Sequence, residues 1–140
     1  MHPLQVAALV LLGLGLSIYL WRSVKRRMRA DEQFFTLLVE RISQILQPKG
    51  FQLTRHLYLP KSFGHRIATF EGPAVLLDLM LDGKERDVRL TRRGRDDSNA
   101  ATEEVLADGY LGFAPTPADY ARATGAVLDA AASMRSLTGA

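Results

Sequence analysis

The segment that most constrains this chain runs from residue 3 to residue 21, reads PLQVAALVLLGLGLSIYLW and carries no charge. As an α-helix it would extend about 28 Å, which is close to the thickness of the hydrocarbon core of a bilayer. Tyr19 and Trp21 fall at its end, where amphipathic rings prefer the headgroup region. The segment therefore predicts a transmembrane helix over about residues 3–21.

Two alternative interpretations of this segment account for it less well. A buried core helix would need a large domain to surround it, because the run is apolar on all sides and the remainder of the chain is small. A cleaved signal peptide would need a basic segment before the run and small residues at a cleavage site after it. Only Met1 and His2 precede the run, and Trp21 and Arg22 follow it. We therefore expect the segment to remain as an anchor.

A basic cluster follows the apolar segment, and no basic residue precedes it; the cluster consists of Arg22, Lys25, Arg26, Arg27 and Arg29. The positive-inside bias then places the N-terminus outside and the C-terminal domain in the cytoplasm. The simplest role of the cluster is that of a topology signal, and the alternative is contact with anionic lipid headgroups. Gly13 and Ser17 form one small-xxx-small pair, through which two copies of the helix could associate as a homo-oligomer.

Composition excludes several classes of protein. The absence of cysteine removes zinc ribbons, iron–sulfur clusters and thiol nucleophiles. From residue 30 onward 13 basic residues face 15 acidic ones, so the overall charge of +3 belongs to the N-terminal segment and nucleic acid is not the expected partner. The length of 140 residues suits one small domain with an appended segment. We expect residues 1–29 to form the anchor with its basic segment and residues 30–140 to form one cytoplasmic domain.

Helical periodicity marks the start of this domain. Asp31 is placed to cap a helix whose apolar positions recur at spacings of three and four, namely Phe34, Phe35, Leu38, Ile42, Ile45 and Leu46. Pro48 and Gly50 should end it, since proline cannot continue the hydrogen-bond ladder and glycine tolerates a left-handed turn.

After Gly50 the apolar period changes to two, which predicts strands. Four are expected, over residues 51–59, 65–70, 75–82 and 85–91. Their inward positions are predicted to be Phe51, Leu53, Leu57 and Leu59, then Val75, Leu77, Leu79 and Leu81, then Val88 and Leu90. Short turns between them, including Asp82-Gly83, favour an antiparallel meander.

A second helix is predicted over residues 117–137, with Pro117 in its first turn and Thr116 as its cap. Between sheet and helix, residues 92–104 have the polar, charged composition of a mobile loop, and Val105 to Phe113 are expected to form a short helix and an aromatic turn. The expected fold is α+β, with the order α-β-β-β-β-α and an antiparallel sheet.

No pattern of residues indicates a particular chemistry. His56 and His65 would share a face only if their strands paired suitably, and a metal site would need a further ligand. Asp78 is expected on the solvent side of its strand. We therefore expect no enzyme, no cofactor and no metal. An enzyme that uses Asp78 with His56 or His65 is the alternative.

A second basic cluster occupies residues 84–95, with six cations against two acids, and the chain beyond residue 95 is acidic. The cluster could be neutralised within the domain, or it could contact a partner through Arg86, Arg89, Arg92 and Arg93. We expect a single-pass membrane protein whose cytoplasmic domain is a non-catalytic protein-interaction module. The alternative is a peripheral domain that binds anionic lipid through residues 22–29 and 84–95.

Overall fold

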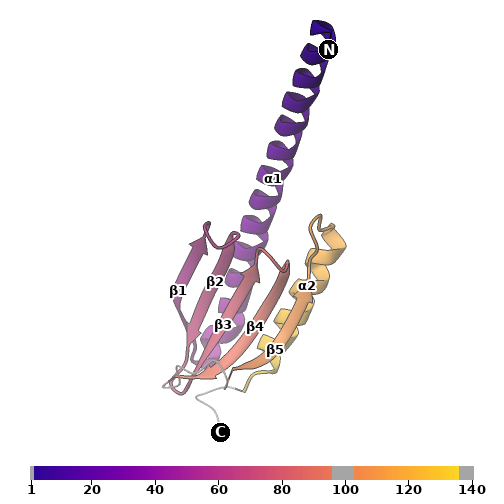
Figure 1. The fold of residues 1–140 in the computed structure, drawn as a ribbon. Coiled ribbons are helices and arrows are strands. Elements are labelled where there is room, and N and C mark those ends of the chain that lie inside the picture. Colours follow the sequence, from indigo (N-terminus) through magenta and orange to yellow (C-terminus); the bar gives the residue numbers. More distant parts are fainter. Residues whose placement is uncertain (1, 96–102, 136–140) are drawn as a thin grey trace. The chain divides into compact units, whose positions relative to one another are not determined.

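The computed structural model describes residues 2–95 and 103–135. The chain divides into two compact units, Met1–Gln33 and Phe34–Ala140. Its elements are α1 (Pro3–Leu46), the 3-10 helix η1 (Gln47–Lys49), β1 (Gln52–Leu59), β2 (His65–Glu71), β3 (Val75–Asp82), β4 (Asp87–Gly94), β5 (Glu104–Tyr110) and α2 (Pro117–Ser133). A long helix with an apolar N-terminal part, an antiparallel sheet and a C-terminal helix make an α+β fold, as the sequence predicted (Figure 1).

The first helix is longer than predicted. The sequence suggested that a separate helix begins at Asp31, but α1 continues without interruption from Pro3 to Leu46, so that prediction is wrong. No glycine or proline lies between Arg22 and Gln33, and the residues there are mostly good helix formers, so no residue in this segment breaks the helix. Within the described residues, α1 is one helix that is long and apolar enough to cross a membrane.

The end of α1 was predicted correctly. Pro48 lies in η1, and Gly50 adopts a left-handed conformation with φ 92°. Two backbone amides then close the end of the helix, because Gly50 N–H donates to the Gln47 carbonyl and Phe51 N–H donates to the Leu46 carbonyl, each at 3.1 Å. These bonds satisfy carbonyls that the helix itself cannot pair.

The sheet is an antiparallel meander with the strand order β1-β2-β3-β4-β5. It has five strands instead of the predicted four, because Glu104–Tyr110 pairs along β4. The sequence suggested a short helix after Val105, which is wrong. The free edge of β4 offers unpaired backbone groups, and pairing with them outweighs the weak local preference of EVLADGY. A mobile loop was predicted over residues 92–104. Residues 92–94 instead belong to β4 and residue 104 begins β5, while residues 96–102 lie outside the described part.

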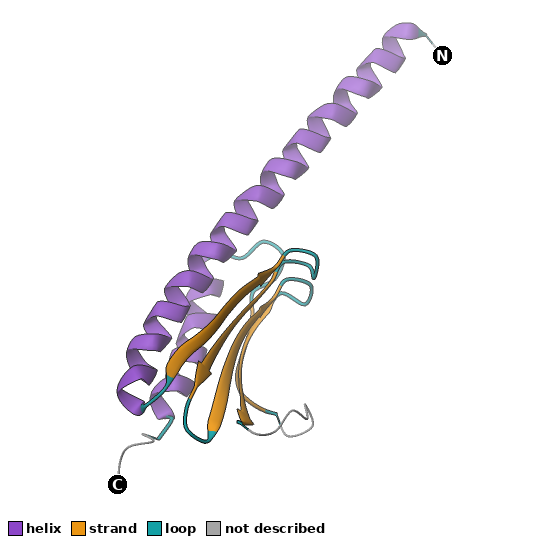
Figure 2. Cartoon of the chain, turned by 90° about the vertical axis from the view of Figure 1, so that its left-hand side faces the viewer, coloured by secondary structure: helices purple, strands orange, loops and turns teal. Residues whose placement is uncertain are grey.

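Within the unit that begins at Phe34, both helical segments cover the same face of the sheet, as Figure 2 shows. The core between them contains, from α1, Phe35, Leu38, Val39, Ile42 and Leu46; from the strands, Ala68, Phe70, Leu77, Leu79, Leu81, Val88 and Leu90; and from α2, Ala123, Val127 and Ala131. The predicted inward positions of β3 and β4 are confirmed. The opposite face of the sheet has no helix over it in the described residues.

The two ends of α2 are fixed in different ways. Thr116 caps its start, as predicted, and forms a capping box with Asp119. At its end the ammonium of Lys49 donates to the carbonyls of Ala131 at 3.2 Å, Ala132 at 2.6 Å and Met134 at 2.5 Å. A cation at the C-terminus of a helix also interacts favourably with the helix dipole. Lys49 thus ties the end of α2 to the turn that follows α1.

A bulge changes the faces of β1. Leu53 pairs with Phe70 and Arg55 with Thr69, so the register shifts between Leu53 and Arg55. The prediction that Leu57 and Leu59 face inward is therefore wrong. His56 lies on the helix side instead, with its ring 5.5 Å from that of Phe35, while Leu57 pairs with Ile67 on the open face. A one-residue insertion reverses the alternation of all residues after it.

Two glycine substitutions test how closely α2 packs on the sheet. A Cβ added at Gly109 would lie 2.9 Å from both Cα and Cβ of Ala123, whereas one added at Gly125 would meet nothing within 4 Å. Gly109→Ala should lower the free energy of unfolding by about 1–3 kcal/mol through overpacking. Gly125→Ala, in the middle of α2, should raise it by up to about 1 kcal/mol through helix propensity.

Chemical denaturation of the full chain in detergent, followed by circular dichroism, measures both variants. Equal effects of the two substitutions would contradict the close contact between β5 and α2.

Candidate binding face of the sheet

The face of the sheet opposite the two helical segments has no helix over it in the described residues (Figure 2). A cavity of about 410 Å³ opens on it and is lined by Arg55, Ile67, Asp78, Met80, Arg89, Thr91, Arg93, Glu103 and Val105. These residues come from all five strands or the residue before β5, and on β2, β3 and β4 they alternate with the core residues. We call this surface the open face. It brings the side chains of three arginines together with those of Ile67, Met80 and Val105.

Asp78 is the centre of a polar network on the open face. Its carboxylate accepts a hydrogen bond from the Thr69 hydroxyl at 2.7 Å and one from Arg93 Nε at 2.9 Å. Thr69 lies opposite Asp78 on β2, and Arg93 lies two residues beyond the opposite position on β4. The predicted solvent-side position of Asp78 is confirmed, and its partners come from its own sheet.

A second network joins β4 and β5. Arg89 donates to Asp87 at 2.9 Å and lies 3.9 Å from a carboxylate oxygen of Asp108. Burial raises the pKa of Asp87, the hydrogen bond and negative charge of Asp108 raise it further, as does Asp82, and Arg89 opposes them. Two atoms in this network are buried without a hydrogen-bond partner, Asp87 Oδ1 and Arg89 Nε. Buried polar atoms usually have partners, so this network has unused hydrogen-bonding capacity.

The arginines of the predicted cluster 84–95 do not lie together. Arg86 is only 2% exposed, and its Nε donates to the Gly112 carbonyl at 2.9 Å, so it anchors the loop after β5. Arg92 points away from the open face and pairs with Glu104. Arg89 and Arg93 reach the open face. Strand alternation thus separates Arg92 from Arg89 and Arg93. Acids of the same unit pair with three of the four arginines, which agrees with the expectation that the cluster could be neutralised within the domain.

Sequence reasoning did not select Arg55 for this site. Arg55 lines the cavity from β1, is exposed, and forms no ion pair among the described residues. It reaches this face because the bulge after Leu53 shifts the register. Bulges have no strong sequence signal, although the break in apolar alternation at Thr54-Arg55-His56 is the trace it leaves.

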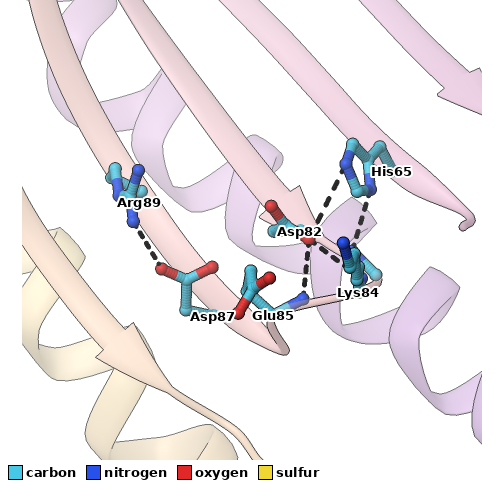
Figure 3. A network of polar contacts seen from close by, with 7 residues as sticks. His65, Asp82, Lys84, Glu85, Asp87 and Arg89 are labelled. Atoms are coloured by element: carbon cyan, nitrogen blue, oxygen red, sulfur yellow. Dashed lines mark hydrogen bonds and ion pairs between the residues drawn. The ribbon is translucent and has the colours of Figure 1, made fainter. Parts of the chain in front are cut away.

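The two strand histidines lie on different faces of the sheet. His65 pairs with Leu59 across the β1–β2 turn and lies next to Asp82 at the end of the sheet (Figure 3). His65 lies four residues before Thr69, the residue opposite Asp78, which is a distance of about 13 Å along β2. His56 lies on the helix side of the sheet. The three residues of the alternative enzyme therefore do not converge. Among the described residues no group of three His, Asp or Glu could hold a metal ion.

His65 and Asp82 instead organise the β3–β4 turn. Gly83 N–H donates to His65 Nδ1 at 3.0 Å, so the ring proton is on Nε2, which lies 3.6 Å from Asp82 Oδ1. That same oxygen accepts the amides of Lys84 and Glu85 at 2.8 Å, as Figure 3 shows. Burial would raise the pKa of Asp82, but these two amides, with His65 and Arg89, hold it below its ordinary value.

The N-terminal basic cluster lies on α1, where Lys25 Nζ is 3.7 Å from the centre of the Trp21 ring. Gly13 and Ser17 are one helical turn apart on the same helix, and nothing lies within 4 Å of a Cβ added at Gly13.

Comparison with protein families, curated proteins and solved structures found no match to this chain.

The acid pair of β4 and β5 should make stability depend on pH. Because the folded state raises the pKa of Asp87, it binds more protons than the unfolded state above the ordinary pKa of 3.8, and stability falls as pH rises through the raised value. Asp108→Asn removes the nearby charge and should raise the free energy of unfolding near neutral pH by up to about 1 kcal/mol. This increase in the free energy of unfolding should become smaller as the pH is lowered, because protonated Asp87 is no longer repelled by Asp108.

Denaturation midpoints of the full chain across this pH interval provide the measurement. Asp129→Asn, at an exposed position on α2, is the matched control and should show no such dependence. A gain from Asp108→Asn that stays constant with pH would contradict the coupling of Asp108 to Asp87.

Proposed function

We propose that this chain is a single-pass membrane protein, with its N-terminus outside, whose cytoplasmic unit is a non-catalytic module that binds an acidic segment of a protein partner on the open face. The observation that carries the proposal is the cavity on the face that no helix of the described residues covers, which is lined by three arginines together with Ile67, Met80 and Val105. Antiparallel sheets often leave one face to solvent, but a hollow lined by three arginines offers more than a solvated face.

The expected partner follows from the donors on the open face. Arg55 is exposed and forms no ion pair in the described part of the chain, and the side chain of Arg89 is 38% exposed although its Nε is buried. Both can donate to a carboxylate, and a guanidinium binds a carboxylate through two parallel hydrogen bonds. Ile67, Met80 and Val105 provide apolar contact beside them. A segment with one or two acidic residues among apolar ones fits this surface.

Support for the membrane anchor comes from α1. Its N-terminal part is long and apolar enough to span a bilayer, and the basic residues that follow it favour the cytoplasmic side for the remainder of the chain. The alternative function, binding of anionic lipid through residues 22–29 and 84–95, is weakened because Arg86 is buried and Arg92 is paired on the other face.

Protease accessibility tests the orientation. A tag after the last residue should be protected in intact cells and should sediment with membranes after an alkaline wash. Digestion of the tag from outside would overturn the orientation, and release by the wash would overturn the anchor.

Photo-crosslinking tests the open face. A benzophenone amino acid in place of Met80, in the full chain in its native membrane, should form an adduct with a protein segment rich in Asp or Glu. Arg55→Gln together with Arg89→Gln should reduce this adduct by about tenfold or more, since a tenfold loss corresponds to about 1.4 kcal/mol and one charge-assisted hydrogen bond is worth about that much.

Two controls make the result specific. The same amino acid in place of Glu40, exposed on α1, should not form the adduct, and Arg41→Gln, also exposed there, should not reduce it. Adducts with lipid alone at position 80, or a protein adduct that the arginine substitutions leave unchanged, would contradict the proposal.

A further inference from the structure

Among the described residues of the unit that begins at Phe34, the three most exposed large apolar side chains lie at one end of the sheet. They are Phe63 at 69%, Phe113 at 68% and Tyr110 at 63% exposure. Phe63 belongs to the turn between β1 and β2, while Tyr110 and Phe113 belong to the end of β5 and the loop before α2. Figure 1 shows these connections at the same end of the sheet, together with the β3–β4 turn. We call this end the turn end.

The connections at the turn end form one continuous surface. A Cβ added at Gly83 would lie 1.8 Å from the Phe63 carbonyl oxygen, so the β1–β2 turn and the β3–β4 turn are in direct contact. Arg86 joins the β3–β4 turn to the last loop, because its Nε donates to the Gly112 carbonyl and its own carbonyl accepts Leu111 N–H at 2.7 Å. The exposed aromatic rings are therefore carried on a connected framework.

The backbone at the turn end is held in unusual conformations. Phe63 and Arg86 have φ values of 57° and 60°, and Gly64 and Gly112 are also left-handed. A left-handed phenylalanine costs conformational energy, and Phe63 gains no burial in the core in return. This combination indicates that the ring is presented outward for contact with another phase or molecule.

Charge and chain connectivity identify that contact. Lys61 and Lys84 are exposed in these turns, and Lys84 Nζ lies 5.6 Å from the centre of the Phe63 ring. Among the acids at this end, Glu85 is exposed, whereas Asp82 accepts the amides of the β3–β4 turn and Asp119 is held by Thr116 and Arg122 at the start of α2. Phe34, where the chain enters this unit, contacts Tyr120 in the first turn of α2, which also lies at the turn end. Only residues 22–33 separate this entry from the apolar segment. Aromatic rings with lysines beside them are typical of membrane interfaces.

We propose that the turn end rests on the anionic bilayer surface, with Phe63 and Phe113 inserted among the headgroups and Lys61 and Lys84 at lipid phosphates. This inference rests on the proposed membrane anchor and adds a second, separate lipid contact. The open face, on the side of the sheet rather than at its end, then stays accessible to a protein partner.

Spin-label depth measurements test the contact, since the chain has no cysteine and each label site is unique. Ser62→Cys and Ala114→Cys place labels beside the two rings, and Ala74→Cys places one in the exposed turn at the other end of the sheet. The labelled full chain is reconstituted into vesicles of phosphatidylcholine and phosphatidylglycerol. The labels at 62 and 114 should be more accessible to oxygen than to a water-soluble nickel chelate, and the label at 74 should show the reverse.

Substitution of the rings provides the second arm. Phe63→Ser with Phe113→Ser should return the label at 114 to aqueous values, whereas Leu53→Ser, at an exposed apolar position on β1, should not. Lys61→Gln with Lys84→Gln should reduce the depth of both labels. Aqueous values at 62 and 114 in the unsubstituted chain, or depths that the ring substitutions leave unchanged, would overturn the inference.

A label at Leu12→Cys separates this failure from failure of the anchor. A label at 12 in hydrocarbon with labels at 62 and 114 in water would overturn the turn-end contact alone. A label at 12 in water would overturn the membrane anchor itself.

Discussion

Burial of one face of a five-stranded sheet is the constraint on which the remainder of this unit depends. The core positions of the strands alternate with polar ones, so only one face can be covered by apolar helices without burying charge. The segment of α1 from Phe34 and the whole of α2 share that task, and Lys49 holds the two helical ends together. Because both helices are committed to this face, the other face is left open for the arginine-lined hollow.

The close approach of α2 extends this constraint to β5. The sequence of α2 is rich in alanine, which buries little area per residue, so α2 contributes to the core only where its backbone comes near the sheet. Gly109 allows that approach against Ala123. Pairing of β5 with β4 and packing of α2 on β5 therefore support each other, and β5, unlike α2, would not be expected from its own residues alone.

Sequence patterns predicted those features that follow from local chemistry. The apolar run at residues 3–21, the end of α1 at Gly50, the inward residues of β3 and the cap at Thr116 depend on nearby residues, and they are found in the helix and strand positions expected. Features that depend on distant pairing were missed. Strand β5 exists because β4 has a free edge, and Arg55 reaches the open face because a bulge shifts β1. The arginines of residues 84–95 are divided between the two faces for a related reason, since alternate residues of a strand face opposite ways.

The ion pairs of the open face determine how a partner could bind there. Arg93 is held by Asp78, and Arg89 by Asp87 and Asp108, so an incoming carboxylate competes with internal acids for two of the three arginines. Such partly exposed pairs contribute about 0–1 kcal/mol, which makes exchange of one carboxylate for another nearly neutral in free energy. Net affinity must then come from Arg55, which forms no ion pair in the described part of the chain, and from the apolar side chains that line the cavity with it. The internal ion pairs would contribute mainly to specificity. They hold the arginines in place, and an uncharged segment that displaced the internal acids would form no new ion pair in return.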